Sequence, residues 1–251
     1  MRFGDELYRD GIDLSTEEFY HKLSADPNFP ATSVPPPAAF VEVYEKLAAE
    51  TDEIVSIHVS SKFSATYDTA LMARDLVQSR CRIEVIDTQN GIMSEGLIVI
   101  AAAQAARAGA NLDEVVEVVR RAIPRVHLRV VFDTLEYLRK GGRIGRAQAL
   151  LGSLLKVNPI LSIRDGETYP LARVRTRAKA IEYLYNFVAG FSNIEKLAIE
   201  DATTADEVDK LAEHLGGLFP KERIYRAKVS PVVGAHVGPH VIAVTVLEGE
   251  S

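Results

Sequence analysis

The sequence predicts a two-domain α/β protein. Up to about residue 125, short β-rich runs alternate with helical patterns at the spacing of βαβ units, which build parallel sheets. Beyond Val126 the regular alternation of strands and helices ends, and Asp165-Gly166 is a turn signal typical of a β-hairpin. We therefore expect an N-terminal parallel-sheet α/β/α domain over residues 1–125. A C-terminal α/β domain over residues 126–251 should have a mixed or antiparallel sheet with helices on one face.

The N-terminal elements follow from spacing and capping signals. Ser15 and Glu18 stand at the spacing of a capping box, which predicts a helix that runs to about Leu23. Phe40, Val43 and later apolar residues at helical spacing predict a second helix. The remaining expected elements are a strand over 53–60, a helix over 64–78, a strand over 82–87, and two long helices separated by Gly109 and the capping candidate Asn111.

The C-terminal elements follow the same rules. A strand is predicted over 126–132, followed by the segment 134–140, the double glycine Gly141-Gly142, a short helix near Ala147 and the segment 159–163 before the hairpin turn. After the hairpin turn we expect a helix over 181–191, a strand over 194–200, a helix over 205–218, and strands over 223–229 and 240–247.

Composition excludes several classes of protein. The 251 residues are 47% hydrophobic and carry a formal net charge of −6, which argues against nucleic acid as a ligand. The single Cys81 excludes an intrachain disulfide and a cysteine-cluster metal site, which suits the cytoplasm. The longest apolar stretch, residues 91–106, is interrupted by Glu95 and Gln104 and is too short to span a membrane. The nucleophile elbow, the phosphate loop, the zinc-binding helix and the dinucleotide turn are all absent from the sequence.

Two turns rich in hydroxyl groups are candidate anion sites. One contains Thr32 and Ser33, and the other, directly after a predicted strand, contains Ser64 and Thr66. Unpaired backbone N–H groups at a helix start, together with nearby hydroxyls, can bind a carboxylate or a phosphate. Each turn taken alone is better interpreted as an ordinary helix cap, because serine and threonine are common there.

A histidine between two glycines is the third candidate. His236 lies between Gly234 and Gly238, and such glycines let a backbone pass close to a ligand or turn sharply. The imidazole could donate a hydrogen bond to a carboxylate. The simpler interpretation is a histidine in a loop. His58, inside a predicted strand, is better interpreted as a core side chain.

Basic residues form two local clusters on this acidic chain. Arg143 follows the double glycine, and Arg173 and Arg175 follow the predicted hairpin. They indicate an anion site or a partner site, whereas the alternative is a solvated face. The solvated face is the better interpretation for Arg177 and Lys179.

Six segments stand in an order that resembles the DegV family. They are Tyr8-Arg-Asp-Gly-Ile-Asp13 with Glu18-Phe-Tyr20, Thr32-Ser33, Ser60-Ser61, Ser64-Ala-Thr-Tyr67, Leu135-Glu-Tyr-Leu138 leading into Gly141-Gly-Arg-Ile144, and Gly234-Ala-His-Val-Gly-Pro239. Each motif is weak alone, but their order over nearly the whole chain is specific.

The resemblance implies a carrier that holds one long-chain fatty acid between its domains, without a catalytic centre, metal or cofactor of its own. The carboxylate would be held by the residues that match the family's head-group motifs, namely Thr32, Ser33, Ser64, Thr66 and His236.

The resemblance extends to the acyl-binding subunit of bacterial fatty acid kinases, in which a separate ATP-dependent subunit phosphorylates the bound carboxyl group. Arg143, Arg173 and Arg175 match arginines near the exit of the site and would assist docking or phosphate transfer. This places the expected role in phospholipid metabolism.

The chain departs from the family pattern in three ways. Family members usually begin with an additional strand that ends in an Asp-Ser-Thr type turn, so either the start codon is misplaced or the parallel sheet lacks its first strand. Ala65 stands where glycine is usual, and Val34 stands where glutamine is common. The methyl group of Ala65 would lie close to the expected carboxylate.

Two other functional classes stay open. An acyl hydrolase or transferase could use Ser64 with His236, although no activating acid is evident beside the histidine. A lipid-responsive regulatory module would instead change a protein–protein contact when loaded.

Overall fold

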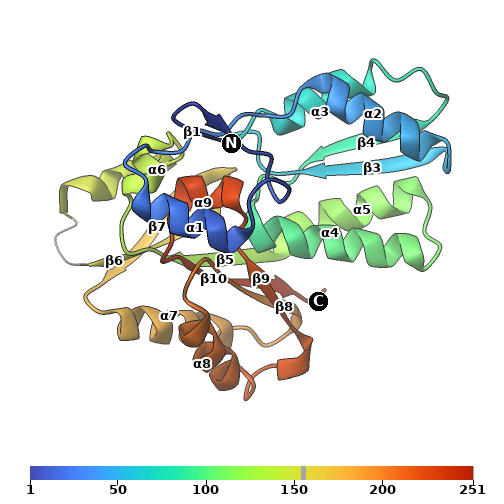
Figure 1. The fold of residues 1–251 in the computed structure, drawn as a ribbon. Helices are drawn as coiled ribbons and strands as arrows, with labels where there is room; N and C mark the ends of the chain where they lie inside the picture. Colours follow the sequence, from blue (N-terminus) through green and yellow to red (C-terminus); the bar gives the residue numbers. More distant parts are fainter. Residues whose placement is uncertain (154–156, 251) are drawn as a thin grey trace. The chain divides into compact units, whose positions relative to one another are not determined.

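The computed structural model describes the fold of residues 1–153 and 157–250 (Figure 1). Contacts divide the chain into two compact units. Unit 1 comprises Met1–Thr32, His127–Arg164 and Thr168–Ser251, and unit 2 comprises Ser33–Val126 and Asp165–Glu167. The longer segment of unit 2 ends at Val126, and the expected domain boundary was at residue 125. Residues 1–32, which we expected in the N-terminal domain, make their contacts within unit 1 instead.

Unit 2 is a layered α/β/α unit around a two-stranded parallel sheet. Strands β3 (Glu53–His58) and β4 (Arg82–Asp87) pair in register from Glu53↔Arg82 to His58↔Asp87. Figure 1 shows helices α2 (Pro37–Ala48) and α3 (Thr66–Arg74) on one face of this sheet, and α4 (Ile92–Arg107) and α5 (Leu112–Ala122) on the other. The parallel α/β architecture predicted for the N-terminal half is therefore confirmed.

Unit 1 contains a six-stranded mixed sheet in the order β7-β6-β5-β10-β8-β9. Strand β10 is antiparallel to β8, whereas β8 and β9 are parallel. The two-residue turn Asp165-Gly166, with positive φ at both residues, connects β6 and β7 as the hairpin signal predicted. The strands are β5 (Val126–Val131), β6 (Asn158–Arg164), β7 (Glu167–Val174), β8 (Ile194–Asp201), β9 (Ile224–Lys228) and β10 (Ile242–Glu248).

Helices cover both faces of this sheet, not one as expected. Figure 1 shows α7 (Arg177–Ala189) and α8 (Ala205–Leu215) on one side, and α1 (Thr16–Ala25) and α9 (Pro231–Val237) on the other. The expectation was wrong because α1 comes from residues 1–32, which pack in unit 1, and because residues 231–237, which were not expected to be helical, form α9. The shorter elements are β1 (Arg2–Phe3), β2 (Glu6–Leu7), α6 (Glu136–Lys140) and the 3-10 helices Ile123–Arg125, Gly145–Ser153 and Lys221–Arg223.

Local capping signals locate two helices correctly. Ser15 N–H donates to Glu18 Oε2 at 2.8 Å, and Glu18 N–H donates to Ser15 Oγ at 3.2 Å. Asn111 and Glu114 make the same reciprocal pair at the start of α5. These bonds satisfy backbone donors that the first helical turn leaves without partners.

Other helix boundaries differ from the sequence expectation. Helix α3 begins at Thr66 rather than residue 64, and its cap position, Ala65, makes no side-chain capping bond. Helix α7 begins four residues earlier than expected, because Thr176 Oγ1 accepts from Lys179 N–H and caps it. Within the described residues, no helix is long and apolar enough to cross a membrane.

Candidate functional site

His236 and Thr32 meet in unit 1 although 204 residues separate them in sequence. Thr32 Oγ1 and His236 Nε2 are 2.8 Å apart. Thr32 directly follows Ala31. The backbone N–H of Ala31 donates to the carbonyl of Arg2 in the N-terminal hairpin, and the carbonyl of Ala31 accepts from the N–H of Arg2. His236 lies in the last turn of α9, so its interpretation as a loop residue is wrong. Pro231 at the first helical position and Gly238 with φ +84° after the last turn explain why this short helix begins and ends there.

Three glycines explain how the imidazole is positioned. A Cβ at residue 234 would collide with the rings of Phe19 and Tyr20, so Gly234 lets α9 lie against α1. A Cβ at residue 141 would collide with His236 Nδ1, so Gly141 lets the ring lie against the end of α6. A Cβ at residue 238 would strike the Tyr137 ring. The glycine-rich motifs around residues 141 and 236 are therefore two halves of one packing arrangement.

His236 is neutral at physiological pH. Burial, and then the nearby positive charge of Arg143, lower the pKa of His236 to about 4. Its Nδ1 atom is buried and has no hydrogen-bond partner among the described residues. A buried N–H without an acceptor costs more than a buried lone pair, so we assign the ring proton to Nε2. On this assignment Nε2–H donates to Thr32 Oγ1, and the Thr32 hydroxyl keeps its own proton for another acceptor.

Arg143 adds a permanent positive charge beside this pair. Its Nη1 donates to the carbonyl oxygen of Gly141 at 2.6 Å, and its backbone oxygen accepts from Thr168 Oγ1 at 2.7 Å. The guanidinium thus bonds the same glycine against which the His236 ring lies, and its charge contributes to the lowered pKa of His236. A neutral histidine, a threonine hydroxyl and a guanidinium together form a donor group suited to an anion.

Ser64 and Thr66 form a second pair, in unit 2. Their hydroxyl oxygens are 2.7 Å apart, and Thr66 N–H donates to Ser64 Oγ at 3.3 Å. Whichever hydroxyl donates to the other, one of the two protons remains for an external acceptor. Ala65 between them is exposed, so its methyl group leaves the contact between the two hydroxyls intact.

The other hydroxyls of this turn are already occupied. The buried Ser60 donates to the carbonyl oxygen of Gly166 at 2.8 Å. Ser61 Oγ donates to Asp87 Oδ2 at 2.6 Å. These bonds stabilise the turn between β3 and α3. Ser64 and Thr66 are therefore the two residues of the turn that keep a hydroxyl proton for a ligand.

The remaining candidates are exposed. Ser33 is the first residue of unit 2, Arg173 lies on β7, and Arg175 follows the end of that strand. Arg177 instead forms ion pairs with Asp133 and Glu207, which supports a structural role for it. The structure thus brings four of the five predicted head-group residues into two pairs. That the pairs meet around one ligand stays a prediction.

The sequence did not reveal the role of Gly141, whose missing side chain leaves room for the imidazole of His236. The signal was present as the double glycine Gly141-Gly142, but nothing local connects it with residue 236. The contact between the Tyr137 ring and Gly238 was not predicted either. Among the described residues, no group of three or more histidine, cysteine, aspartate or glutamate side chains could hold a metal ion.

Comparisons with known proteins identify the family of the chain. The profile of the DegV family matches residues 1–249. A DegV domain-containing protein of Caldanaerobacter subterraneus subsp. tengcongensis is 36% identical over 240 residues, which cover 94% of this chain and 85% of the relative. A homologue from Streptomyces coelicolor is 35% identical, over 97% of this chain and 87% of its own.

Two solved structures have the same fold. The fatty-acid-binding DegV family protein of Thermus thermophilus superposes with a TM-score of 0.89 at 28% identity, over 98% of this chain and 89% of that one. DegV of Bacillus subtilis, described as a fatty acid binding protein, has a TM-score of 0.89 and 28% identity, over 99% and 89% of the two chains. With the family profile matched along almost its whole length, the chain belongs to the DegV family.

Proposed function

We propose that this protein binds one long-chain fatty acid, with the carboxylate held by Thr32, Ser33, Ser64, Thr66 and His236. The observation that carries the proposal is the Thr32–His236 pair, in which a neutral imidazole orients a threonine hydroxyl beside a guanidinium. Two structures of similar fold, from Thermus thermophilus and Bacillus subtilis, are of fatty-acid-binding proteins.

The acyl tail supplies most of the affinity. Burial of one methylene contributes about 0.8 kcal/mol, so a tail of some fifteen methylenes contributes roughly 12 kcal/mol before ordering and association costs. Each charge-assisted hydrogen bond to the carboxylate adds about 1.5–3 kcal/mol, and a buried carboxylate without such bonds would be strongly disfavoured. The head-group donors therefore set the orientation of the ligand, with the carboxylate at the mouth of the site.

Mass spectrometry of the freshly purified and then denatured protein tests this function. We expect one long-chain fatty acid per chain. His236→Ala and Thr32→Val should each reduce the bound amount. His214→Ala removes an exposed histidine from α8 and should leave the amount unchanged. An empty wild-type protein, or equal loading of all variants, would overturn the proposal.

We further propose that the bound acid is presented to a separate ATP-dependent fatty acid kinase subunit, which would make the protein a carrier rather than an enzyme in its own right. Arg143 is the proposed contact for the phosphate or the partner, assisted by the exposed Arg173 and Arg175. This role of Arg143 is supported by the effect of its positive charge, which lowers the pKa of His236, the histidine that would face the carboxylate.

Reconstitution with a fatty acid kinase subunit and ATP tests the presentation step. We expect acyl phosphate to form only when both proteins are present, and Arg143→Ala to lower the rate even when wild type and variant are compared at equal fatty acid loading. Arg80→Ala, a change at an exposed arginine of unit 2, is the matched control. Acyl phosphate formation that is equally fast with Arg143→Ala would remove that residue from the docking site.

A further inference from the structure

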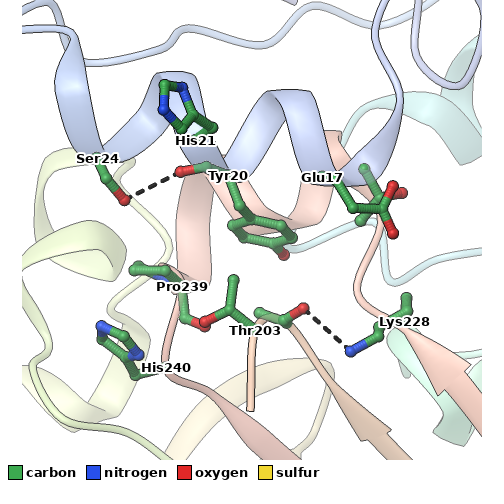
Figure 2. Close-up of a pocket in the computed structure, with 10 residues that line it drawn as sticks. Glu17, Tyr20, His21, Ser24, Thr203, Lys228, Pro239 and His240 are labelled. Carbon is green, nitrogen blue, oxygen red and sulfur yellow. Dashed lines mark hydrogen bonds between the residues drawn. The ribbon is translucent and has the colours of Figure 1, made fainter. Parts of the chain in front are cut away.

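A pocket in unit 1 is lined by none of the proposed head-group residues. Its volume is about 400 Å³, within the range of small-molecule sites. Helix α1 provides one wall through Glu17, Tyr20 and Ser24, and the opposite wall includes Thr203, Lys228 and Pro239 (Figure 2).

The pocket lies at an edge of the sheet where ligands commonly bind. Thr203 follows the end of β8, and Lys228 is the last residue of β9. These two strands are parallel neighbours, so their carboxyl ends lie at the same edge of the sheet. Ligands of open α/β sheets collect at this edge because loops from adjacent strands diverge there.

The lining of the pocket is mostly apolar, and three of its hydroxyl groups present hydrogen-bond acceptors. Tyr20 donates its hydroxyl proton to the Val229 carbonyl at 3.0 Å. Ser24 donates to the Tyr20 carbonyl at 3.0 Å, and Thr203 donates to the Pro239 carbonyl at 2.7 Å. All three protons are thus used by backbone oxygens, and only the oxygen lone pairs remain to face a ligand.

The charges near the pocket are predominantly negative. Asp201, at the end of β8 and only 3% exposed, accepts from Lys228 Nζ at 2.7 Å, so the one lysine of the pocket already has a counter-ion. Among the described residues, none forms a hydrogen bond or ion pair with the Glu17 carboxylate, which lies at the same end of the pocket as Lys228 in Figure 2. Burial, followed by the negative charges of Glu200, Asp201 and Asp10, raises the pKa of Tyr20.

An ammonium group matches each of these features. It brings three N–H donors to a pocket of acceptors, and a positive charge to the Glu17 carboxylate. His21 and His240, at the other end of the pocket in Figure 2, can offer a ring nitrogen as a further acceptor when neutral. We propose that this pocket of unit 1 binds a small aliphatic di- or polyamine, a ligand class separate from the fatty acid.

Calorimetric titration with spermidine at low ionic strength tests the proposal. We expect saturable binding at one site, and we expect glutarate, a small aliphatic dianion, not to bind. Glu17→Gln should weaken spermidine binding by about fivefold, the range of an exposed ion pair. Ser24→Arg places a cation at the mouth of the pocket and should abolish binding.

A matched control separates the pocket from the general attraction of an amine to an acidic protein. Glu182→Gln, on the exposed face of α7, changes the net charge by the same amount as Glu17→Gln and should leave the affinity unchanged. Equal weakening by both substitutions, undiminished binding to Ser24→Arg, or the absence of saturable binding to the wild-type protein would each overturn the proposal. Fatty acid content is not a readout, so this test stands independently of the carrier function.

Discussion

His236 has its pKa lowered to about 4 because burial and the charge of Arg143 both disfavour the imidazolium form. A bound carboxylate would offset both effects. We therefore expect fatty acid binding to raise the pKa of His236 by about one unit or more, since an opposite charge at close range shifts a pKa by this amount. An NMR titration of the ring Cε1–H signal, in loaded and delipidated protein, measures the shift. An unchanged pKa would place the carboxylate elsewhere.

Glu95 carries a partly buried carboxyl group that the proposed function does not use. Burial, and then the charge of Asp87, raise the pKa of Glu95 to about 8. In the unfolded chain the group titrates near its ordinary value of 4.5. Between these two values the folded protein binds one more proton than the unfolded chain, so stability falls as pH rises through this window.

Glu95→Gln should therefore stabilise the protein at pH 8, on the order of a few kcal/mol, and much less at pH 5. Thermal unfolding of wild-type and variant proteins at the two pH values measures the difference. Glu117→Gln, on an exposed position of α5, is the control and should behave as wild type at both. A stabilisation of equal size at both pH values would contradict the titration argument.

At the scale of elements, the contact between α1 and α9 determines where the histidine lies. Helix α1 begins at its own capping box, and its Phe19 and Tyr20 pack on Gly234 of α9. The hydroxyl of Tyr20 also reaches the backbone just beyond β9. The position of His236 is thus fixed by a helix more than 200 residues earlier in the chain.

Gly234→Ala should disturb this contact, because the added methyl would meet two aromatic rings that cannot both move away. We expect a loss of about 1–3 kcal/mol of unfolding free energy, as is usual for overpacking, together with reduced fatty acid loading. Denaturant unfolding and lipid mass spectrometry measure the two effects. Gly217→Ala, where a Cβ makes only ordinary contacts, is the matched control. Unchanged stability of Gly234→Ala would show that α1 and α9 can separate at little cost.

At the scale of the whole molecule, a ligand that binds only the folded state should control thermal stability. Stabilisation grows with RT ln(1 + [L]/Kd), about 2.7 kcal/mol when the ligand is at a hundred times its Kd. We expect delipidation to lower the unfolding midpoint. Re-addition of a long-chain fatty acid should restore it, whereas a short-chain acid at equal concentration should not, because it buries fewer methylenes. Differential scanning calorimetry measures the effect, and equal recovery with both acids would argue against tail burial.

Part of the molecule follows from local sequence alone. The helix starts at Ser15 and Asn111 are correct because a capping box needs residues only three positions apart. The hairpin at Asp165-Gly166 is correct because two adjacent residues adopt the required positive φ. The order of the DegV motifs was likewise enough to identify the family.

Tertiary structure decided the rest, because it depends on contacts between distant residues that no local pattern encodes. Residues 1–32 pack in unit 1, His236 lies on a helix, and its Nε2 meets Thr32 across 204 positions. The sequence could name Thr32 and His236 as candidates by motif. Their hydrogen bond and the neutral state of the imidazole arise only when α1, α6 and α9 pack together, and the pocket only when α1 lies against the ends of β8 and β9, since burial and neighbouring charge are properties of the folded chain.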